Sequence, residues 1–313
     1  MDDLIYYCGK VPAGVIAPST AYAFDGARVL IDGPEGITSA DRNDERELRQ
    51  ALQASGALVV GSAQEVGNVI ALLSAPQSSR TASYLLCSAS QCAQVIGDLR
   101  TLSAARIMVV GCGGIGSSLC MLLAGVGVRN FILVDADTIE QSNLNRQFFW
   151  TLADIGRSKV TVLKAALEAR FESMQIECLC AQPGIADLIA LSCGNVDAVA
   201  VTADNPPTLA RDSWEIAERC NIPVVAGGYL HHRCSAFCFI PDDCAEVESS
   251  RKLFEETYAG LPSAIMPSYG PMNVSLAAVL ATQMIMALAT LTFGLPRTRV
   301  DTWDSRGEHG FDC

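Results

Sequence analysis

The chain contains, at residues 107–116, the stretch Ile-Met-Val-Val-Gly-Cys-Gly-Gly-Ile-Gly. Its first four residues form the apolar run of a buried parallel strand, and a helical pattern follows its glycines. Glycines in this context allow a tight turn and bring the backbone close to a phosphate, which the amino end of the helix attracts. The stretch therefore predicts a nucleotide-binding domain of the α/β class, with a Rossmann-like doubly wound sheet.

The chain around this turn supports the same fold. Asp135 lies 24 positions after Gly111, at the end of the strand predicted over residues 130–134, where a carboxylate accepts hydrogen bonds from ribose hydroxyls. Strands and helices alternate further along the chain, as the βα units of a doubly wound sheet require. The later strands are predicted over residues 176–180, 198–202 and 223–226, and the helices over 116–125, 159–171 and 214–219.

Fixed cations separate a triphosphate-cleaving enzyme from a hydride-transfer enzyme, which has no need of them. Arg146 can bind two phosphate oxygens through its planar guanidinium, and Lys159 supplies a point charge. Asp204 follows the strand predicted over 198–202 and can hold Mg²⁺ between phosphates. Its other interpretation is a helix cap, because two prolines follow one residue later.

Five motifs in this order resemble those of ubiquitin-activating-type adenylating enzymes, the E1-like (ThiF/MoeB-type) superfamily. They are Gly-x-Gly-Gly-Ile-Gly, Asp-x-Asp, Ser-Asn-Leu-x-Arg-Gln, Gly-x-x-Lys and Asp-Asn. The resemblance implies ATP and Mg²⁺ as cofactors, and attack of a substrate carboxylate on the α-phosphate. The implied catalytic residues are Arg146, Lys159 and Asp204, and Asp204 is also the implied magnesium ligand. The implied nucleotide-binding residues are Gly111, Gly113, Gly114, Gly116, Asp135, Asp137, Ser142, Asn143, Arg146, Gln147, Lys159 and Asp204.

The first part of the chain has a different pattern of predicted secondary structure from the rest. It combines short predicted strands and small helices without an obvious catalytic cluster: strands over residues 4–8 and 28–31, helices over 43–54 and 63–73. We predict a small αβ, winged-helix-like module over residues 1–85 and the adenylation domain over 86–313. This order resembles the peptide-modifying branch of the superfamily, which includes the enzymes of microcin C and pantocin A biosynthesis. By that resemblance, residues 1–85 are a peptide clamp. The Asp-Thr-Trp-Asp-Ser sequence at residues 301–305 is similar to a Trp-Ser-Asp element of the same branch.

The resemblance implies ATP-dependent activation of carboxylates, of glutamate side chains or a C-terminus, in a ribosomally made precursor peptide of antibiotic biosynthesis. Direct attack of a substrate nucleophile would then give dehydration and ring closure. It also implies a homodimer, in which Arg80 of one copy reaches the site of the other. The alternative is adenylation of the C-terminus of a ubiquitin-like sulfur-carrier protein. A non-catalytic nucleotide sensor and an NAD-dependent oxidoreductase are further readings, the latter permitted by the glycine turn alone.

The cysteines depart from the superfamily pattern. There are 13, yet no Cys-x-x-Cys pair, so we expect no structural zinc of the usual kind. Some relatives carry the acyl group on a cysteine thioester. Cys220, Cys234, Cys238 and Cys244 lie in the corresponding half of the chain, but no sequence signature assigns the role to any of them. A weaker candidate metal cluster comprises His231, His232, Cys234, Cys238 and Cys244.

Composition narrows the class of protein further. A net charge of −12 and a pI of about 4.7 are untypical of nucleic-acid binders, which show a basic face. Acidic residues at the start do not resemble a secretory signal, so we expect a cytoplasmic protein with reduced thiols. Residues 276–293 carry no formal charge. We interpret this run as a buried or subunit-interface helix rather than a membrane span, because polar residues interrupt it.

Overall fold

The computed structural model describes residues 2–205, 209–243 and 268–306. The chain forms two compact units, one up to Leu102 together with Ala289–Leu295, and the other comprising the remainder. The first unit extends beyond residue 85 because Cys92 and Val95 are buried in one core with Val66. The assignment of residues 1–85 to a peptide clamp stays a prediction.

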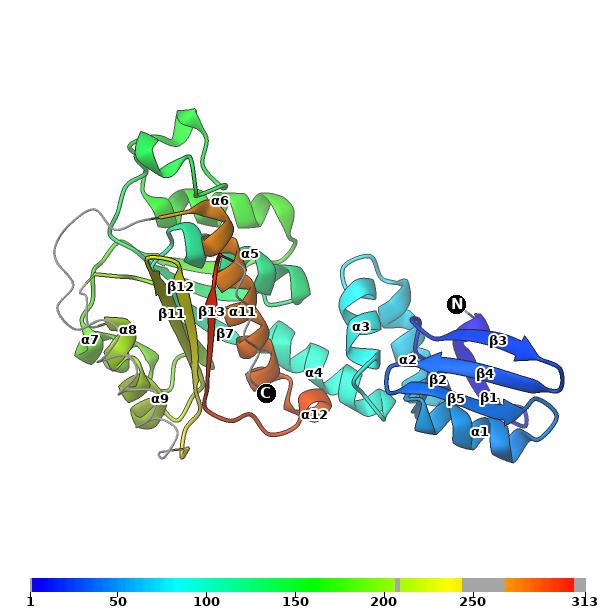
Figure 1. Ribbon diagram of the computed structural model, residues 1–313. Helices are drawn as coiled ribbons and strands as arrows, with labels where there is room; N and C mark the ends of the chain where they lie inside the picture. Colours follow the sequence, from blue (N-terminus) through cyan, green and yellow to red (C-terminus); the bar gives the residue numbers. More distant parts are fainter. Residues whose placement is uncertain (1, 206–208, 244–267, 307–313) are drawn as a thin grey trace. The chain divides into compact units, whose positions relative to one another are not determined.

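A seven-stranded sheet organises the second unit, in the order β13-β12-β11-β10-β7-β8-β9 (Figure 1). Five neighbouring strands, β11, β10, β7, β8 and β9, are parallel, and β12 and β13 are antiparallel. The predicted Rossmann-like fold is therefore confirmed. The strands are β7 (Arg106–Val110), β8 (Asn130–Val134), β9 (Gln175–Leu179), β10 (Ala198–Val201), β11 (Val224–Leu230), β12 (Arg233–Phe239) and β13 (Arg299–Asp304).

Helices cover both faces of this sheet (Figure 1). Val109 and Leu133 point into a core shared with one set of helices, and the alternate residues Val110 and Val134 point into a core shared with the other. This alternation explains why the strands are apolar throughout. The first set is α5 (Gly114–Val126), α6 (Lys159–Arg170) and α11 (Gly270–Leu288), and the second is α7 (Ile185–Ser192), α8 (Leu209–Asp212) and α9 (Trp214–Cys220).

The uncharged run at residues 276–293 is not one helix. It belongs to α11 up to Leu288, and a separate helix, α12 (Thr290–Phe293), lies in the first unit. Among the described residues, α11 is the one helix long and apolar enough to cross a membrane. Its side chains Leu276, Leu280 and Met284 are nevertheless fully buried in the core of the second unit, as predicted for a buried helix.

Two small antiparallel sheets and the helices α1 to α4, together with α12, build the first unit. Asp44 caps α1 by accepting hydrogen bonds from the N–H groups of Arg46 and Glu47, and Ser62 and Glu65 form a capping box at α2. The sheets are β1-β2-β6, with β1 (Ile5–Cys8), β2 (Val11–Ile16) and β6 (Leu58–Val60), and β3-β4-β5, with β3 (Ala21–Asp25), β4 (Arg28–Gly33) and β5 (Gly36–Asp41). The helices are α1 (Glu45–Ala54), α2 (Ala63–Ser74), α3 (Ser79–Leu86) and α4 (Cys92–Ala104).

A buried carboxylate joins the distant segment Ala289–Leu295 to the first unit. Asp98 on α4 is 1% exposed and accepts hydrogen bonds from the backbone N–H groups of Leu291 and Thr292. These N–H groups lie in the first turn of α12, where a carboxylate is favourable. The contact explains why seven residues near the end of the chain belong to its first unit.

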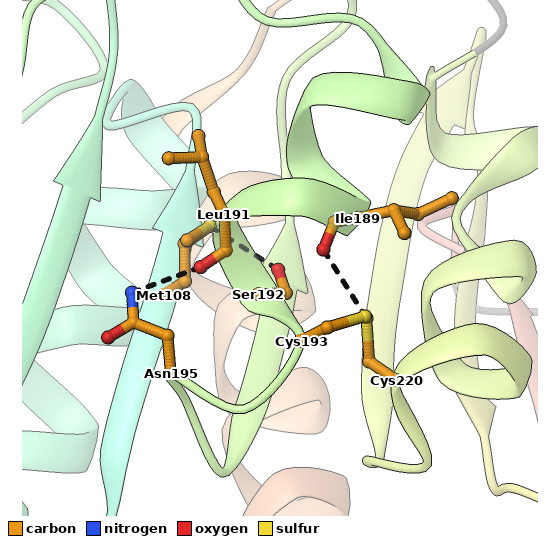
Figure 2. The surroundings of a disulfide bond; sticks show 7 residues. All are labelled: Met108, Ile189, Leu191, Ser192, Cys193, Asn195 and Cys220. Carbon is orange, nitrogen blue, oxygen red and sulfur yellow. Dashed lines mark hydrogen bonds between the residues drawn. A yellow bond between two sulfur atoms is a disulfide. The ribbon is translucent and has the colours of Figure 1, made fainter.

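A disulfide corrects the expectation that every thiol is reduced. Cys193, after α7, is bonded to Cys220, the last residue of α9 (Figure 2). The same Cys220 sulfur lies 3.5 Å from the carbonyl oxygen of Ile189. The two cysteines are 27 positions apart in a region without a Cys-x-x-Cys pattern, so the sequence offered no sign of the bond. Both lie at the ends of helices that run back towards the amino ends of the parallel strands, so the disulfide lies at the end of the sheet opposite the glycine turn.

Candidate nucleotide-binding site

The glycine turn follows β7, the strand from which the strand order proceeds in both directions. β7 pairs with β8 on one side and with β10 on the other, which places the turn at the switch point where open α/β sheets bind ligands. Gly111 has φ +86°, and a Cβ there would lie 2.6 Å from the backbone nitrogen of Ala203. A Cβ on Gly116 would overlap the carbonyl oxygen of Gly111. The turn therefore requires glycine at both positions.

Asp135 is held against this turn. One carboxylate oxygen accepts a hydrogen bond from the N–H of Cys112 at 2.6 Å, and the other accepts one from the N–H of Asp137 at 2.8 Å. Burial raises the pKa of Asp135, and these two hydrogen bonds oppose the shift. The carboxylate is thus fixed at the end of β8 beside the phosphate turn, where a ribose acceptor is expected.

Lys159 brings a nearly buried cation to the same edge. It is the first residue of α6, its side chain is 8% exposed, and its Nζ donates to Oδ2 of Asp137 at 2.7 Å. Asp137 is exposed, so its carboxylate pairs with the lysine from the solvent side. A buried ammonium beside a helix N-terminus and a glycine turn suits an anion such as a phosphate.

The loop that precedes Lys159 presents four further predicted residues. Ser142 donates to Glu140, and buried Asn143 accepts from the backbone N–H of Glu140. The Arg146 guanidinium donates to the carbonyl oxygen of Ser142 at 2.6 Å, so it folds back onto its own loop. The fourth residue, Gln147, is buried, and its Nε2 lies 3.5 Å from where a Cβ of Gly113 would be.

Asp204 stands at the carboxyl end of β10, exposed and next to the glycine turn along the sheet edge. An exposed carboxylate at this place fits Mg²⁺, which takes one or two protein carboxylates and completes its shell with phosphate oxygens and water. Within the described residues, no group of three His, Cys, Asp or Glu side chains gathers to hold a metal. Mg²⁺ would therefore depend on the nucleotide for most of its ligands.

Arg80 is exposed near the start of α3, in the first unit. Its predicted role in the site of a second copy stays a prediction.

The candidate metal cluster near β12 does not converge in the part that the structure describes. Cys234 and Cys238 are four residues apart on β12, which separates them by about 13 Å along a strand. His232 instead lies 3.4 Å from Asp304, while Cys244 lies outside the described residues.

Three of the four cysteines in the half of the chain that could carry a thioester are disulfide-bonded or buried. Cys220 is in the disulfide, and burial raises the pKa of Cys234 to about 11 and that of Cys238 to about 12. A thiol with so high a pKa is a poor nucleophile near neutral pH. The fourth candidate, Cys244, falls outside the described chain.

Sequence reasoning missed three polar side chains that shape the site. Buried Asn273 on α11 donates to the carbonyl oxygen of Arg146 at 3.4 Å and accepts from the Tyr229 hydroxyl at 2.8 Å. Thr202 donates to the carbonyl oxygen of Gly111 at 2.7 Å and so braces the turn. A lone asparagine at the start of a long apolar run was the one available signal for Asn273.

Comparisons with known proteins agree with this geometry. The sequence model described as "ThiF family" matches residues 89–306. The chain is 40% identical over 139 residues to the mouse (Mus musculus) protein "Adenylyltransferase and sulfurtransferase MOCS3", a match that spans 44% of this chain and 29% of the mouse protein. It is 39% identical over 79 residues to the "NEDD8-activating enzyme E1 catalytic subunit" of Caenorhabditis elegans, over 25% of this chain and 18% of that protein. The chain thus spans less than a third of the length of these curated relatives.

Solved structures resemble the whole fold. A crystal structure of E. coli MccB covers 94% of this chain and 94% of its own, with a TM-score of 0.70 and 18% identity. A structure of PaaA covers 82% of this chain and 91% of its own, with a TM-score of 0.58 and 20% identity. At this level of identity the likeness concerns the fold, which in MccB extends over both units described above.

Proposed function

The chain belongs to the ThiF family of E1-like adenylating enzymes, and on that premise we propose that it uses ATP to activate a carboxylate of a peptide. One observation carries the proposal: nearly buried Lys159, the glycine turn and Asp135 gather at the switch point of the sheet. The turn and the helix N-terminus suit the phosphates, Asp135 suits the ribose, and Lys159 suits the charge on the departing pyrophosphate.

The reaction follows from these placements. A carboxylate oxygen of the substrate attacks the α-phosphorus, and the bond from that phosphorus to the bridging oxygen of pyrophosphate breaks. Lys159 and Arg146 stabilise the negative charge that moves onto pyrophosphate. Mg²⁺, held by Asp204 when bound, would neutralise part of the same charge. The product is an acyl-adenylate, and attack of a nucleophile on its acyl carbon then releases AMP.

The peptide nature of the substrate rests on the first unit. MccB, whose fold is shared over both units, has been crystallised with the peptide MccA. β3 is an edge strand, and all five of its residues are exposed. Tyr22 and Phe24 are two residues apart on it, so both rings lie on the same face of the strand. An extended peptide can add a strand to such an edge and place side chains against the two rings. We assign the unit to recognition of a precursor peptide, with a glutamate side chain or C-terminus as the activated group and ring closure as the outcome.

The chain acts as a homodimer in this proposal, and exposed Arg80 of one copy contributes to the nucleotide site of the other. Sedimentation tests this part, because a monomer at all concentrations would exclude it. Exchange activity restored by mixing an Arg80→Ala variant with a Lys159→Ala variant would support shared sites, since one of the mixed sites would then be intact.

Exchange of radioactive pyrophosphate into ATP tests the reaction. We expect exchange that requires a peptide bearing a free carboxylate, together with release of AMP on longer incubation. Exchange without any peptide would indicate a small-molecule acid, and tight binding of NAD without exchange would overturn the proposal.

A second candidate is activation of a sulfur-carrier protein, favoured by the 40% identity to a protein described as an adenylyltransferase and sulfurtransferase. Exchange that depends on a small carrier protein ending in Gly-Gly, and is unaffected by peptides, would select this alternative.

A further inference from the structure

An indole fixes the orientation of one carboxamide at the glycine turn. Trp150 and Gln147 are 5% and 6% exposed, and the indole N–H of Trp150 donates to Oε1 of Gln147 at 2.7 Å. We propose that Trp150 is a positioning residue that makes Gln147 present its amide nitrogen, and not its oxygen, to the phosphates of bound ATP. This inference rests on the proposed function, because it assumes a nucleotide at the turn.

The polarity of the contact follows from the chemistry of the two groups. An indole nitrogen only donates hydrogen bonds, so its partner at 2.7 Å is the carbonyl oxygen of the carboxamide. The nitrogen then lies at the other end of the group, on the side of Gly113, 3.5 Å from where a Cβ of that glycine would be. Gln147 thus directs N–H groups towards the backbone that surrounds a phosphate.

Rotation of the carboxamide by half a turn is strongly disfavoured. It would bring the amide N–H groups against the indole N–H and leave two buried donors without an acceptor, which is energetically costly. Trp150 itself cannot easily give way, because it is part of the main core beside Val160 and Leu163 and packs edge-to-face on Phe149.

The orientation matters because phosphate oxygens only accept hydrogen bonds when ionised. A carboxamide nitrogen attracts them, and a carboxamide oxygen in the same place repels them. Lys159 and Arg146 attract any anion, whereas the oriented Gln147 adds a directional donor at the turn.

Binding of a non-hydrolysable α,β-methylene analogue of ATP tests the inference without peptide or turnover. Trp150→Phe keeps an aromatic ring and removes the N–H, and we expect about ten-fold weaker binding, as for one buried hydrogen bond. Gln147→Glu keeps the oxygen that accepts from Trp150 but replaces the amide nitrogen with a charged oxygen. We expect it to bind the analogue more weakly than Gln147→Ala does.

Phe149→Leu is the matched control, because Phe149 packs on Trp150 without contacting the Gln147 carboxamide through a hydrogen bond. It should lower the melting temperature and leave the affinity unchanged. Trp150→Phe should have no further effect on affinity in a Gln147→Ala background, which a merely structural role would not produce. Gln147→Glu binding as tightly as the unaltered protein would overturn the inference, and so would equal losses from Trp150→Phe with and without Gln147. Failure of the unaltered protein to bind the analogue would instead refute the proposed function.

Discussion

The two units of the chain differ in the side chains that their sheets present. The sheet unit buries polar groups at the carboxyl ends of its parallel strands, where Asn143, Gln147, Lys159 and Asn273 are all buried. The first unit instead exposes large apolar side chains on its strands, including Tyr22 and Ile37, both 71% exposed. Buried polar groups are costly unless they are positioned for a ligand or a partner, and exposed apolar groups are costly to solubility unless a partner covers them. The difference fits the proposed division, with chemistry in one unit and recognition in the other.

Removal of the buried cation should give the largest effect. Lys159→Ala takes away a preorganised charge at the phosphates, so exchange should fall at least about 100-fold. Lys164→Ala on the same helix is the control, because half-buried Lys164 contacts Glu168 and the carbonyl oxygen of Ile176 on β9 instead of the glycine turn. Pyrophosphate exchange measures both variants. Equal activity of the two would mean that the sheet unit does not concentrate its chemistry at this end of the sheet.

We expect the disulfide to contribute to the stability of the sheet unit and not to nucleotide binding. This would distinguish the end of the sheet that holds the candidate site from the end that holds the disulfide. Cys193→Ser combined with Cys220→Ser should lower the free energy of unfolding by about 3 kcal/mol, from the entropy of closing a loop of this length. Affinity for the ATP analogue should stay unchanged, since the bond lies at the opposite end of the sheet. Urea unfolding with and without a reducing agent measures the effect. Cys8→Ser, at an exposed free thiol, provides the control.

Substitutions in the first unit should change the KM for the peptide and should not change the affinity for ATP. Tyr22→Ser with Phe24→Ser should raise the KM for the peptide about ten-fold, because two exposed rings leave the edge strand, and should not alter ATP affinity. Tyr84→Ser, at an exposed ring on α3, should leave the KM for the peptide unchanged. A loss of ATP affinity in the first variant would contradict the division of roles between the units.

The smallest effect concerns pH. The raised pKa of Asp135 means that, as pH falls, this carboxylate takes up a proton at a higher pH than an ordinary aspartate. ATP binding should therefore weaken from that higher pH downwards, because the protonated group no longer accepts two ribose hydrogen bonds. The same shift makes Asp135 lower the stability of the fold as pH rises, since the unfolded chain releases the proton more readily.

Calorimetric titration across the acid range measures this effect. Inorganic triphosphate, which has no ribose, should not show the additional weakening at low pH. The same acid dependence for both ligands would assign it to another group.

Local patterns in the sequence were enough for the parallel half of the sheet. The strand predicted over 130–134 is β8 without change, and the helices predicted over 159–171 and 214–219 are α6 and α9 to within one residue. Hydrophobic periodicity and glycine turns are local signals, so they can be recognised in a single sequence. The antiparallel strands β12 and β13 were not predicted, and the pairing of β13 with β12 joins residues about 65 positions apart, which a local pattern does not reach. The last five residues of the uncharged run, 289–293, belong to the first unit and not to the helix that holds the rest.

The sequence alone determined that a glycine turn, the carboxylate of Asp135 and the cations Arg146 and Lys159 occur in a fixed order, because those residue types follow strands and helices that local patterns define. The tertiary structure decided how they act together: Asp137 pairs with Lys159, Asn273 reaches the Arg146 loop, and Trp150 orients Gln147. It also decided that Cys193 and Cys220 are bonded. Contacts between side chains depend on where folded elements meet in space, and a local sequence pattern does not specify which distant residues come together.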